Sequence, residues 1–143
     1  MRKTCMGLCL LLFLATISVA GTRVQPRIPS FPGTLANARF VYVTSYDGDQ
    51  FDPLLLPEDQ NAINAVQDAI QKWGQFVLVY QPGVADIVLM VQSRPSEDIL
   101  AVYDAQGWPR NDYLWRMMGR NGLQQDETPL VTDLRKAFEK TTK

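Results

Sequence analysis

Apolar side chains recur at helical spacing in the middle of the chain. Four large ones are separated by three, four and three positions: Ile63, Val66, Ile70 and Trp73. This spacing places them on one face of an α-helix. Pro57 suits the first helical position, where its missing N–H costs no hydrogen bond, and Gly74 suits the left-handed residue that ends a helix. The pattern predicts an amphipathic helix over residues 57–73, against which the rest of the domain packs.

Five shorter runs, apolar or alternating, predict β-strands. They span residues 39–46, 76–80, 86–92, 99–104 and 113–118. Alternation groups side chains on one face of the first strand (Phe40, Tyr42, Thr44) and of the fifth (Tyr113, Trp115, Met117). The runs at 76–80 and 86–92 are apolar on both faces, which is typical of covered strands. We expect the run at 86–92 to be a central strand.

The chain closes with a second predicted helix, at residues 129–140, with Thr128 as its expected N-cap. The order of elements is therefore β-α-β-β-β-β-α. It predicts an α/β fold of the α+β type, with two helices and a five-stranded mixed sheet. The first two strands are expected to be parallel, and the last two to form an antiparallel hairpin. The pattern leaves open whether the helices share one face of the sheet.

The N-terminus has the three parts of a secretory signal peptide. Arg2 and Lys3 are basic, residues 5–17 are almost uninterruptedly apolar, and Ser18-Val19-Ala20 offers small residues at a cleavage site. We expect residues 1–20 to be removed, which leaves no stable membrane anchor and a periplasmic or secreted protein. An uncleaved anchor is the alternative, but the apolar run is short for a membrane span.

Prolines recur at every third position in the next segment, at Pro26, Pro29 and Pro32. This spacing matches a polyproline II conformation and blocks helices and central strands. Residues 21–35 are therefore predicted to be a flexible tether, with a partner-docking segment as the alternative. Residues 36–143 are predicted to be a single globular domain.

Composition narrows the chemistry. The sequence contains no histidine, and its two cysteines, Cys5 and Cys9, lie in the predicted signal peptide. Ser-His-Asp and Cys-His catalysis, the usual zinc sites and haem attachment through cysteine are therefore excluded for the mature chain, and we expect no cofactor. Without Arg2 and Lys3, the 14 basic residues fall to 12 against 15 acidic ones, a net charge of −3. This balance argues against nucleic acid as a partner.

Three short motifs resemble a pattern found in small exported proteins of the bacterial envelope. They are Ala85-Asp86 at the start of an apolar strand, Val102-Tyr103-Asp104 in the next strand, and Leu114-Trp115-Arg116 before the last helix. Over residues 38–138 the chain is similar to uncharacterised families of exported α/β proteins and, more distantly, to the N-terminal domain of the periplasmic protein TolB. The resemblance implies the fold and an envelope location, and it assigns no catalytic residue.

Aromatic and cationic side chains concentrate around the predicted hairpin of residues 99–118. Exposed, they offer a stacking platform for sugar rings or a hot spot for a partner protein; buried, they are cross-strand pairs. The candidate binding residues are Tyr103, Trp108, Tyr113 and Arg116. We expect Tyr103 and Trp115 to be mainly buried, whereas Trp108 lies in a Gly-Trp-Pro turn and is the better surface candidate. Arg110, Arg116 and Arg120 offer an anion-binding edge or ordinary surface pairing.

Two groups of carboxylates offer further chemistry. Asp47, Asp49 and Asp52 have spacings used in calcium loops, but the sixth position of that pattern holds aspartate instead of glycine, so we interpret them as a solvated turn. Asp104 and Asp112 bracket the hairpin and are candidates for a glycosidase pair, with turn formation as the alternative.

The sequence supports two functional hypotheses. The first is an exported, non-catalytic binding or assembly module that binds an envelope protein or a cell-wall component through a sheet edge or the aromatic hairpin. The alternative is a carboxylate-dependent hydrolase acting on cell-wall glycan. A small stabilising subunit without a small ligand is a third possibility.

Overall fold

The structure is a computed structural model, and it describes residues 27–124 and 128–143. The predicted signal peptide, residues 1–20, lies outside the described residues. The strands are β1 (Phe40–Ser45), β2 (Val77–Val79), β3 (Ile87–Ser93), β4 (Asp98–Asp104) and β5 (Trp115–Gly119). The helices are α1 (Pro57–Trp73) and α2 (Pro129–Thr141), with short 3-10 turns at Gly33–Leu35 and Pro82–Val84. The order β-α-β-β-β-β-α confirms the predicted fold class.

The five strands form one mixed sheet in the order β2-β1-β3-β4-β5. Strand β1 pairs in parallel with both β2 and β3, whereas the β3–β4 and β4–β5 pairs are antiparallel. The predicted parallel start, central third strand and closing hairpin are therefore confirmed. Helix α1 supplies the crossover that a parallel β1–β2 connection requires.

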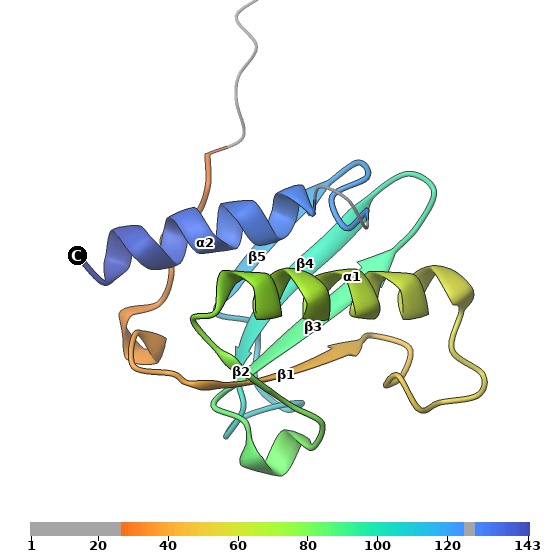
Figure 1. Cartoon of the computed structure of the whole chain (residues 1–143), viewed down its shortest axis with the longest axis horizontal. Coiled ribbons are helices and arrows are strands. Elements are labelled where there is room, and N and C mark those ends of the chain that lie inside the picture. The colour runs from red at the N-terminus through yellow and green to blue at the C-terminus, as the bar shows by residue number, and fades with distance from the viewer. Residues whose placement is uncertain (1–26, 125–127) are drawn as a thin grey trace, which may run out of the picture.

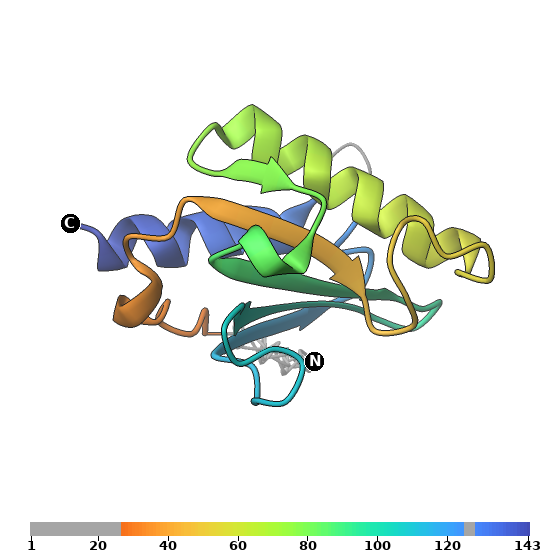
Figure 2. The same ribbon diagram turned by 90° about the horizontal axis from the view of Figure 1, so that it is seen from below.

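Both helices lie on the same face of the sheet, with α1 across β1 and β3 and α2 across β4 and β5 (Figure 1). The apolar stripe of α1 points into the core, where Ile63, Val66 and Ile70 are completely buried. Leu134 and Phe138 of α2 enter the same core. The two helices thus remove one face of the sheet from water and leave the other face free of helices (Figure 2). Within the described residues, neither helix combines the length and apolar character of a membrane span.

The ends of the helices follow local rules with one exception. Pro57 opens α1, and Gly74 ends it with φ of 73° while its N–H donates to the Ile70 carbonyl. Thr128 occupies the predicted N-cap position of α2, but its side chain makes no capping hydrogen bond. Instead, the backbone N–H of Leu130 donates to the Gly122 carbonyl at 3.1 Å, which ties the start of α2 to the preceding loop.

The second strand is an edge strand, so the prediction that it is covered on both faces is wrong. Strand β2 has one neighbour, β1, and the Val77 side chain is 56% exposed. Phe76 is buried and Leu78 packs against the core. Only one face of the run at residues 76–80 is therefore packed against the core. Because the residue exposed on the other face, Val77, is also apolar, the sequence pattern did not distinguish the two faces.

The predicted flexible tether is wrong for its described part, residues 27–35. Phe31 is 3% exposed and meets Phe138 of α2 edge-to-face at 5.1 Å between ring centroids. The Trp115 indole N–H donates to the Pro29 carbonyl at 3.0 Å, and the Thr141 hydroxyl donates to the Phe31 carbonyl at 3.2 Å. The folded unit therefore begins before residue 36, because apolar residues between the prolines are buried against α2 and β5.

Candidate functional site

The face of the sheet without helices, here called the open face, carries most of the candidate residues. Tyr42 of β1 and Tyr103 of β4 flank Val88 of β3 in register, and Arg116 of β5 pairs with Ala101. The segment between β4 and β5, residues 105–114, lies on this face, opposite α1 (Figure 2). It contributes Trp108, which packs against the small core of the open face.

The structure brings the four predicted binding residues to the open face. Tyr103 and Tyr113 meet edge-to-face at 6.4 Å between ring centroids, and the Arg116 guanidinium lies 5.5 Å from the centre of the Tyr113 ring. The latter distance is that of a cation–π contact. Trp108 meets Tyr42 edge-to-face at 6.2 Å. Three of the four residues therefore form one chain of contacts, Tyr103–Tyr113–Arg116, and the fourth, Trp108, contacts Tyr42.

Three burial and face predictions for this hairpin have different outcomes. Trp115 is 1% exposed in the helix-covered core, as predicted, whereas Tyr103 is half-buried. The prediction that Tyr113 shares a face with Trp115 is wrong. Strand β5 begins only at Trp115, so Tyr113 belongs to the preceding loop and is free of strand alternation.

Sequence reasoning missed Tyr42 and Tyr46 as site residues. The hydroxyl groups of Tyr46 and Tyr103 are hydrogen-bonded at 3.2 Å, although 57 positions separate the residues. Alternation along β1 already placed Tyr42 away from Val41 and Val43. Tyr42 could have been identified as a site residue only from the finding that its face of the sheet carries no helix, which is a property of the tertiary structure.

A hollow opens between the end of β1 and the Trp108 segment, with a volume of about 420 Å³. We call it the aromatic hollow. Its first wall is the segment from Thr44 to Asp49, and its second wall is formed by Tyr42, Met90, Trp108 and Pro109. Tyr46 is 40% exposed and Trp108 is half-buried, so both rings are accessible to a ligand.

The first wall is a tight turn held by its own hydrogen bonds. The Thr44 hydroxyl donates to the Gly48 carbonyl at 3.1 Å, and the Asp47 N–H donates to the Ser45 hydroxyl at 3.0 Å. Gly48 has φ of 151°, and a Cβ there would lie 2.7 Å from the Asp52 carboxylate. A glycine is therefore required at this position.

An ion pair between a buried carboxylate and a partly exposed arginine anchors this turn to the domain. Asp59, in the first turn of α1, is fully buried, and its carboxylate accepts hydrogen bonds from the Ser93 N–H at 2.8 Å and the Arg94 guanidinium at 3.0 Å. The same guanidinium is also paired with Asp47. Asp59 foremost, and then Asp47, raise the pKa of Arg94. Helix α1, the β3–β4 loop and the rim of the aromatic hollow are thus held together by one arginine.

The pKa of two tyrosines of the site, Tyr42 and Tyr103, is raised above the ordinary value. Burial raises the pKa of Tyr103, and its hydrogen bond with Tyr46 adds to the effect. Burial also raises the pKa of Tyr42, with a smaller contribution from the negative charge of Asp49. The Arg116 Nε is buried and has no hydrogen-bond partner among the described residues. Within the part of the chain that the structure describes, the contact of this guanidinium with the Tyr113 ring is therefore a cation–π contact without a hydrogen bond at Nε.

The aspartates of residues 47–52 act as turn formers. Asp49 accepts a hydrogen bond from the Phe51 N–H at 2.8 Å, Asp52 accepts one from the Leu54 N–H at 2.9 Å, and Asp47 is paired with Arg94. In residues 27–124 and 128–143, no group of three or more potential ligand side chains is placed to hold a metal ion. The geometry agrees with the turn interpretation of this segment.

The carboxylate pair of the hydrolase hypothesis lies at the two ends of the hairpin loop. Asp104 ends β4, and its carboxylate accepts a hydrogen bond from the Gln106 N–H at 2.9 Å, as expected of a turn former. Asp112 is exposed in the loop. Arg110 and Arg120, the other cations of the proposed anion-binding edge, are also exposed.

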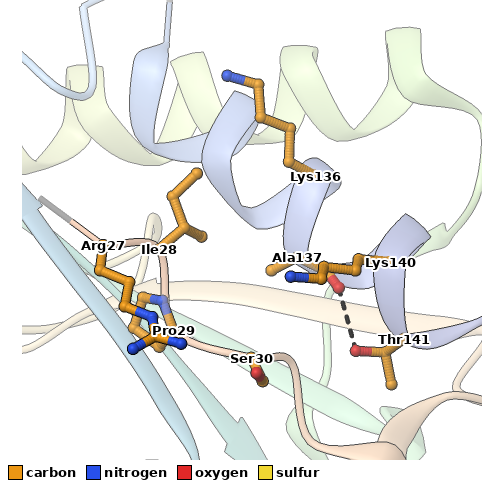
Figure 3. A pocket seen from close by; sticks show the side chains of 8 residues that line it. All are labelled: Arg27, Ile28, Pro29, Ser30, Lys136, Ala137, Lys140 and Thr141. Atoms are coloured by element: carbon orange, nitrogen blue, oxygen red, sulfur yellow. Dashed lines mark hydrogen bonds between the residues drawn. The ribbon is translucent and has the colours of Figure 1, made fainter. Parts of the chain in front are cut away.

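A second, larger hollow of about 590 Å³ lies between residues 27–30 and the C-terminal half of α2 (Figure 3). Ile28 and Ala137 form its apolar part, and Arg27, Lys136 and Lys140 line its rim. The Lys136 ammonium and the Arg27 guanidinium point away from each other (Figure 3). These cations are surface side chains that do not converge on one point, so this hollow is not a built anion site.

Comparisons of the chain with protein-family models, with curated proteins and with solved structures give no significant match.

Proposed function

We propose that this protein is an exported, non-catalytic binding module that engages a protein or a cell-wall component of the bacterial envelope with the open face of its sheet. The observation that carries the proposal is the accessible pair of Tyr46 and Trp108 on either side of the aromatic hollow. Tyrosine, tryptophan and arginine are the residue types that most often dominate binding energies. Here they gather on the face that the helices leave free.

The competing interpretation is that these aromatic residues only hold the hairpin in register. It accounts for Tyr103 and Tyr113, which meet across the hairpin. It also accounts for the contacts of Tyr46 with Tyr103 and of Trp108 with Tyr42. It does not account for the hollow that Tyr46 and Trp108 line from different parts of the chain.

The envelope as the source of the partner rests on the sequence of residues 1–20, whose basic, apolar and small-residue parts have the order of a signal peptide. The absence of histidine and of mature-chain cysteine favours binding over catalysis. We therefore expect the open face to recognise its envelope partner by shape and noncovalent contacts.

Retention on envelope material tests the proposal. The exported protein is incubated with insoluble cell walls and, separately, with solubilised envelope extract, beside a Tyr46→Ala/Trp108→Ala double variant. Tyr80→Ala is the matched control, because Tyr80 is also an exposed aromatic residue but lies beyond the edge strand β2. Wild type and control are expected to be retained, and the double variant lost. Equal retention of all three proteins, or retention of none, would contradict the proposal.

A further inference from the structure

We infer that the aromatic hollow binds an uncharged sugar ring of a glycan. This inference rests on the proposed function and names the ligand of the same site. It follows from the unequal chemistry of the two walls, from their rigidity, and from the charge around them.

The walls of the hollow match the two-sided chemistry of a pyranose ring. The first wall, here called the oxygen wall, offers the Asp49 carboxylate beside the exposed Tyr46 ring, and the other wall offers the Trp108 ring beside the largely buried Tyr42 and Met90. A pyranose has an apolar C–H face, which packs on aromatic rings, and a rim of hydroxyl groups, which donate to carboxylates and carbonyls. A purely apolar ligand would cover the Asp49 carboxylate, whose Oδ1 accepts from the Phe51 N–H, without donating to its second oxygen, at a cost in binding.

Both walls are fixed before a ligand arrives. The oxygen wall is held by the Thr44–Gly48 hydrogen bond and by the Arg94–Asp47 ion pair. On the other side, the backbone N–H of Trp108 donates to the Asp104 carbonyl at 3.1 Å, and the indole ring packs against Tyr42. Preorganised walls reduce the ordering cost of binding.

The charge around the hollow determines which sugars fit. Among the described residues, the lining contains Asp47 and Asp49 but neither lysine nor arginine. Arg94 neutralises Asp47 from behind, so Asp49 supplies the uncompensated charge. Acidic or phosphorylated sugars are therefore disfavoured, and neutral ones are accepted. The volume of about 420 Å³ lies in the lower part of the range, roughly 300–1,000 Å³, of small-molecule sites.

The test is isothermal titration calorimetry of the intact exported protein with tetrasaccharides of stated charge and, separately, with one small organic cation. The neutral probes are β-1,4-linked tetramers of N-acetylglucosamine and of glucose, the acidic probe is a galacturonic acid tetramer, and the cationic probe is tetramethylammonium. We expect saturable binding of at least one neutral tetramer and much weaker binding of the acidic one.

Variants locate the binding to the hollow. Trp108→Ala is expected to weaken binding of the neutral tetramer by about fivefold or more through loss of stacking. Asp49→Asn is expected to weaken it by roughly threefold to tenfold, because a charged acceptor becomes neutral. The asparagine oxygen still accepts the Phe51 N–H, so this variant keeps the fold if Trp108→Ala does not. Tyr80→Ala is expected to bind as wild type does.

Three results would overturn the inference: no neutral tetramer saturates the protein, neither Trp108→Ala nor Asp49→Asn changes the affinity, or tetramethylammonium alone binds. Its failure is distinguishable from failure of the proposed function. If envelope retention depends on Tyr46 and Trp108 while neutral tetramers do not bind, the inferred sugar ligand is wrong, but the proposed binding through the open face is supported. If retention is also independent of these residues, both proposals fall.

Discussion

The two faces of the sheet differ in chemistry, although the same strands build both. The helix-covered face consists of large apolar side chains: Val41, Val43, Ile87, Leu89, Val91, Leu100, Val102, Trp115 and Met117. The open face has a small buried apolar centre at Val88, Met90 and Ala101, and its outlying apolar side chains, such as Phe40 and Met118, are exposed. Tyr42, Tyr103 and Arg116 surround that centre with side chains that have an apolar body and a polar end.

The helix-covered face is therefore fully packed, whereas the open face remains partly exposed to solvent. Helices exclude water from the first face, so each side chain there contributes through burial alone. The loop over the open face covers only part of it, and tyrosine, tryptophan and arginine tolerate such partial cover because their polar ends reach water. The aromatic hollow lies where this cover ends.

The largest expected effect comes from neighbouring residues of β3 that point to opposite faces. Leu89→Ala, in the helix-covered core, is expected to lower the free energy of unfolding by about 3–4 kcal/mol, because two rigid helices cannot close the cavity. Met90→Ala, under the Trp108 loop, is expected to cost about 2 kcal/mol, since the loop can relax into the space. Urea denaturation measures both values. Equal losses would show that the two faces are packed equally well.

The buried carboxylate that links the two faces should have the next largest effect. Asp59→Ala removes the acceptor of the Ser93 N–H and one partner of Arg94, and we expect a loss of about 2–3 kcal/mol in unfolding free energy. Arg94 is partly exposed, so water can solvate its charge and limit the loss. Asp68→Ala, an exposed position on the same helix, is the control. A loss no larger than that of the control would remove Asp59 as the anchor of the hollow's rim.

The smallest expected effect lies at the end of the open face and depends on pH. The backbone N–H groups of Arg39 and Phe40 donate to the Asp86 carboxylate at 2.8 and 3.0 Å and lower its pKa. The folded state therefore binds the proton less readily than the unfolded chain does. The resulting stabilisation is complete above the ordinary pKa of 3.8 and is lost as the pH falls through the lower, folded value.

Asp86→Asn separates this contribution from the rest of acid unfolding. Because the carboxylate is exposed, we expect the variant to lose less than about 1 kcal/mol at pH 7, and the difference from wild type to vanish in strong acid. Thermal unfolding measured from pH 7 to pH 2 gives the difference. A difference that grows toward low pH would have the wrong sign for this mechanism.

Most residues of the candidate site could be predicted from the sequence, but their three-dimensional arrangement could not. Tyr103, Trp108, Tyr113 and Arg116 lie within one hairpin, so local spacing was enough to bring them together. Tyr46 is 57 positions from its hydrogen-bond partner Tyr103, and no local pattern joins them. The hollow exists only because β1 ends beside the Trp108 loop.

The sequence by itself determined the elements whose causes are local. The spacing of Ile63, Val66 and Ile70, together with Pro57 and Gly74, defines α1 from end to end. Apolar runs and turns likewise specified five strands and their order along the chain, because backbone propensity and the period of side-chain burial act between neighbours.

Tertiary structure decided everything that depends on which surfaces meet. The sheet order made β2 an exposed edge, and the placement of both helices on one face created the open face. Phe31 is buried because Phe138 of α2 is there to receive it, despite the prolines around it. Asp59 and Arg94 pair across 35 positions for the same reason. Burial, unlike helical or strand periodicity, is a property of two segments, and one segment read alone cannot specify it.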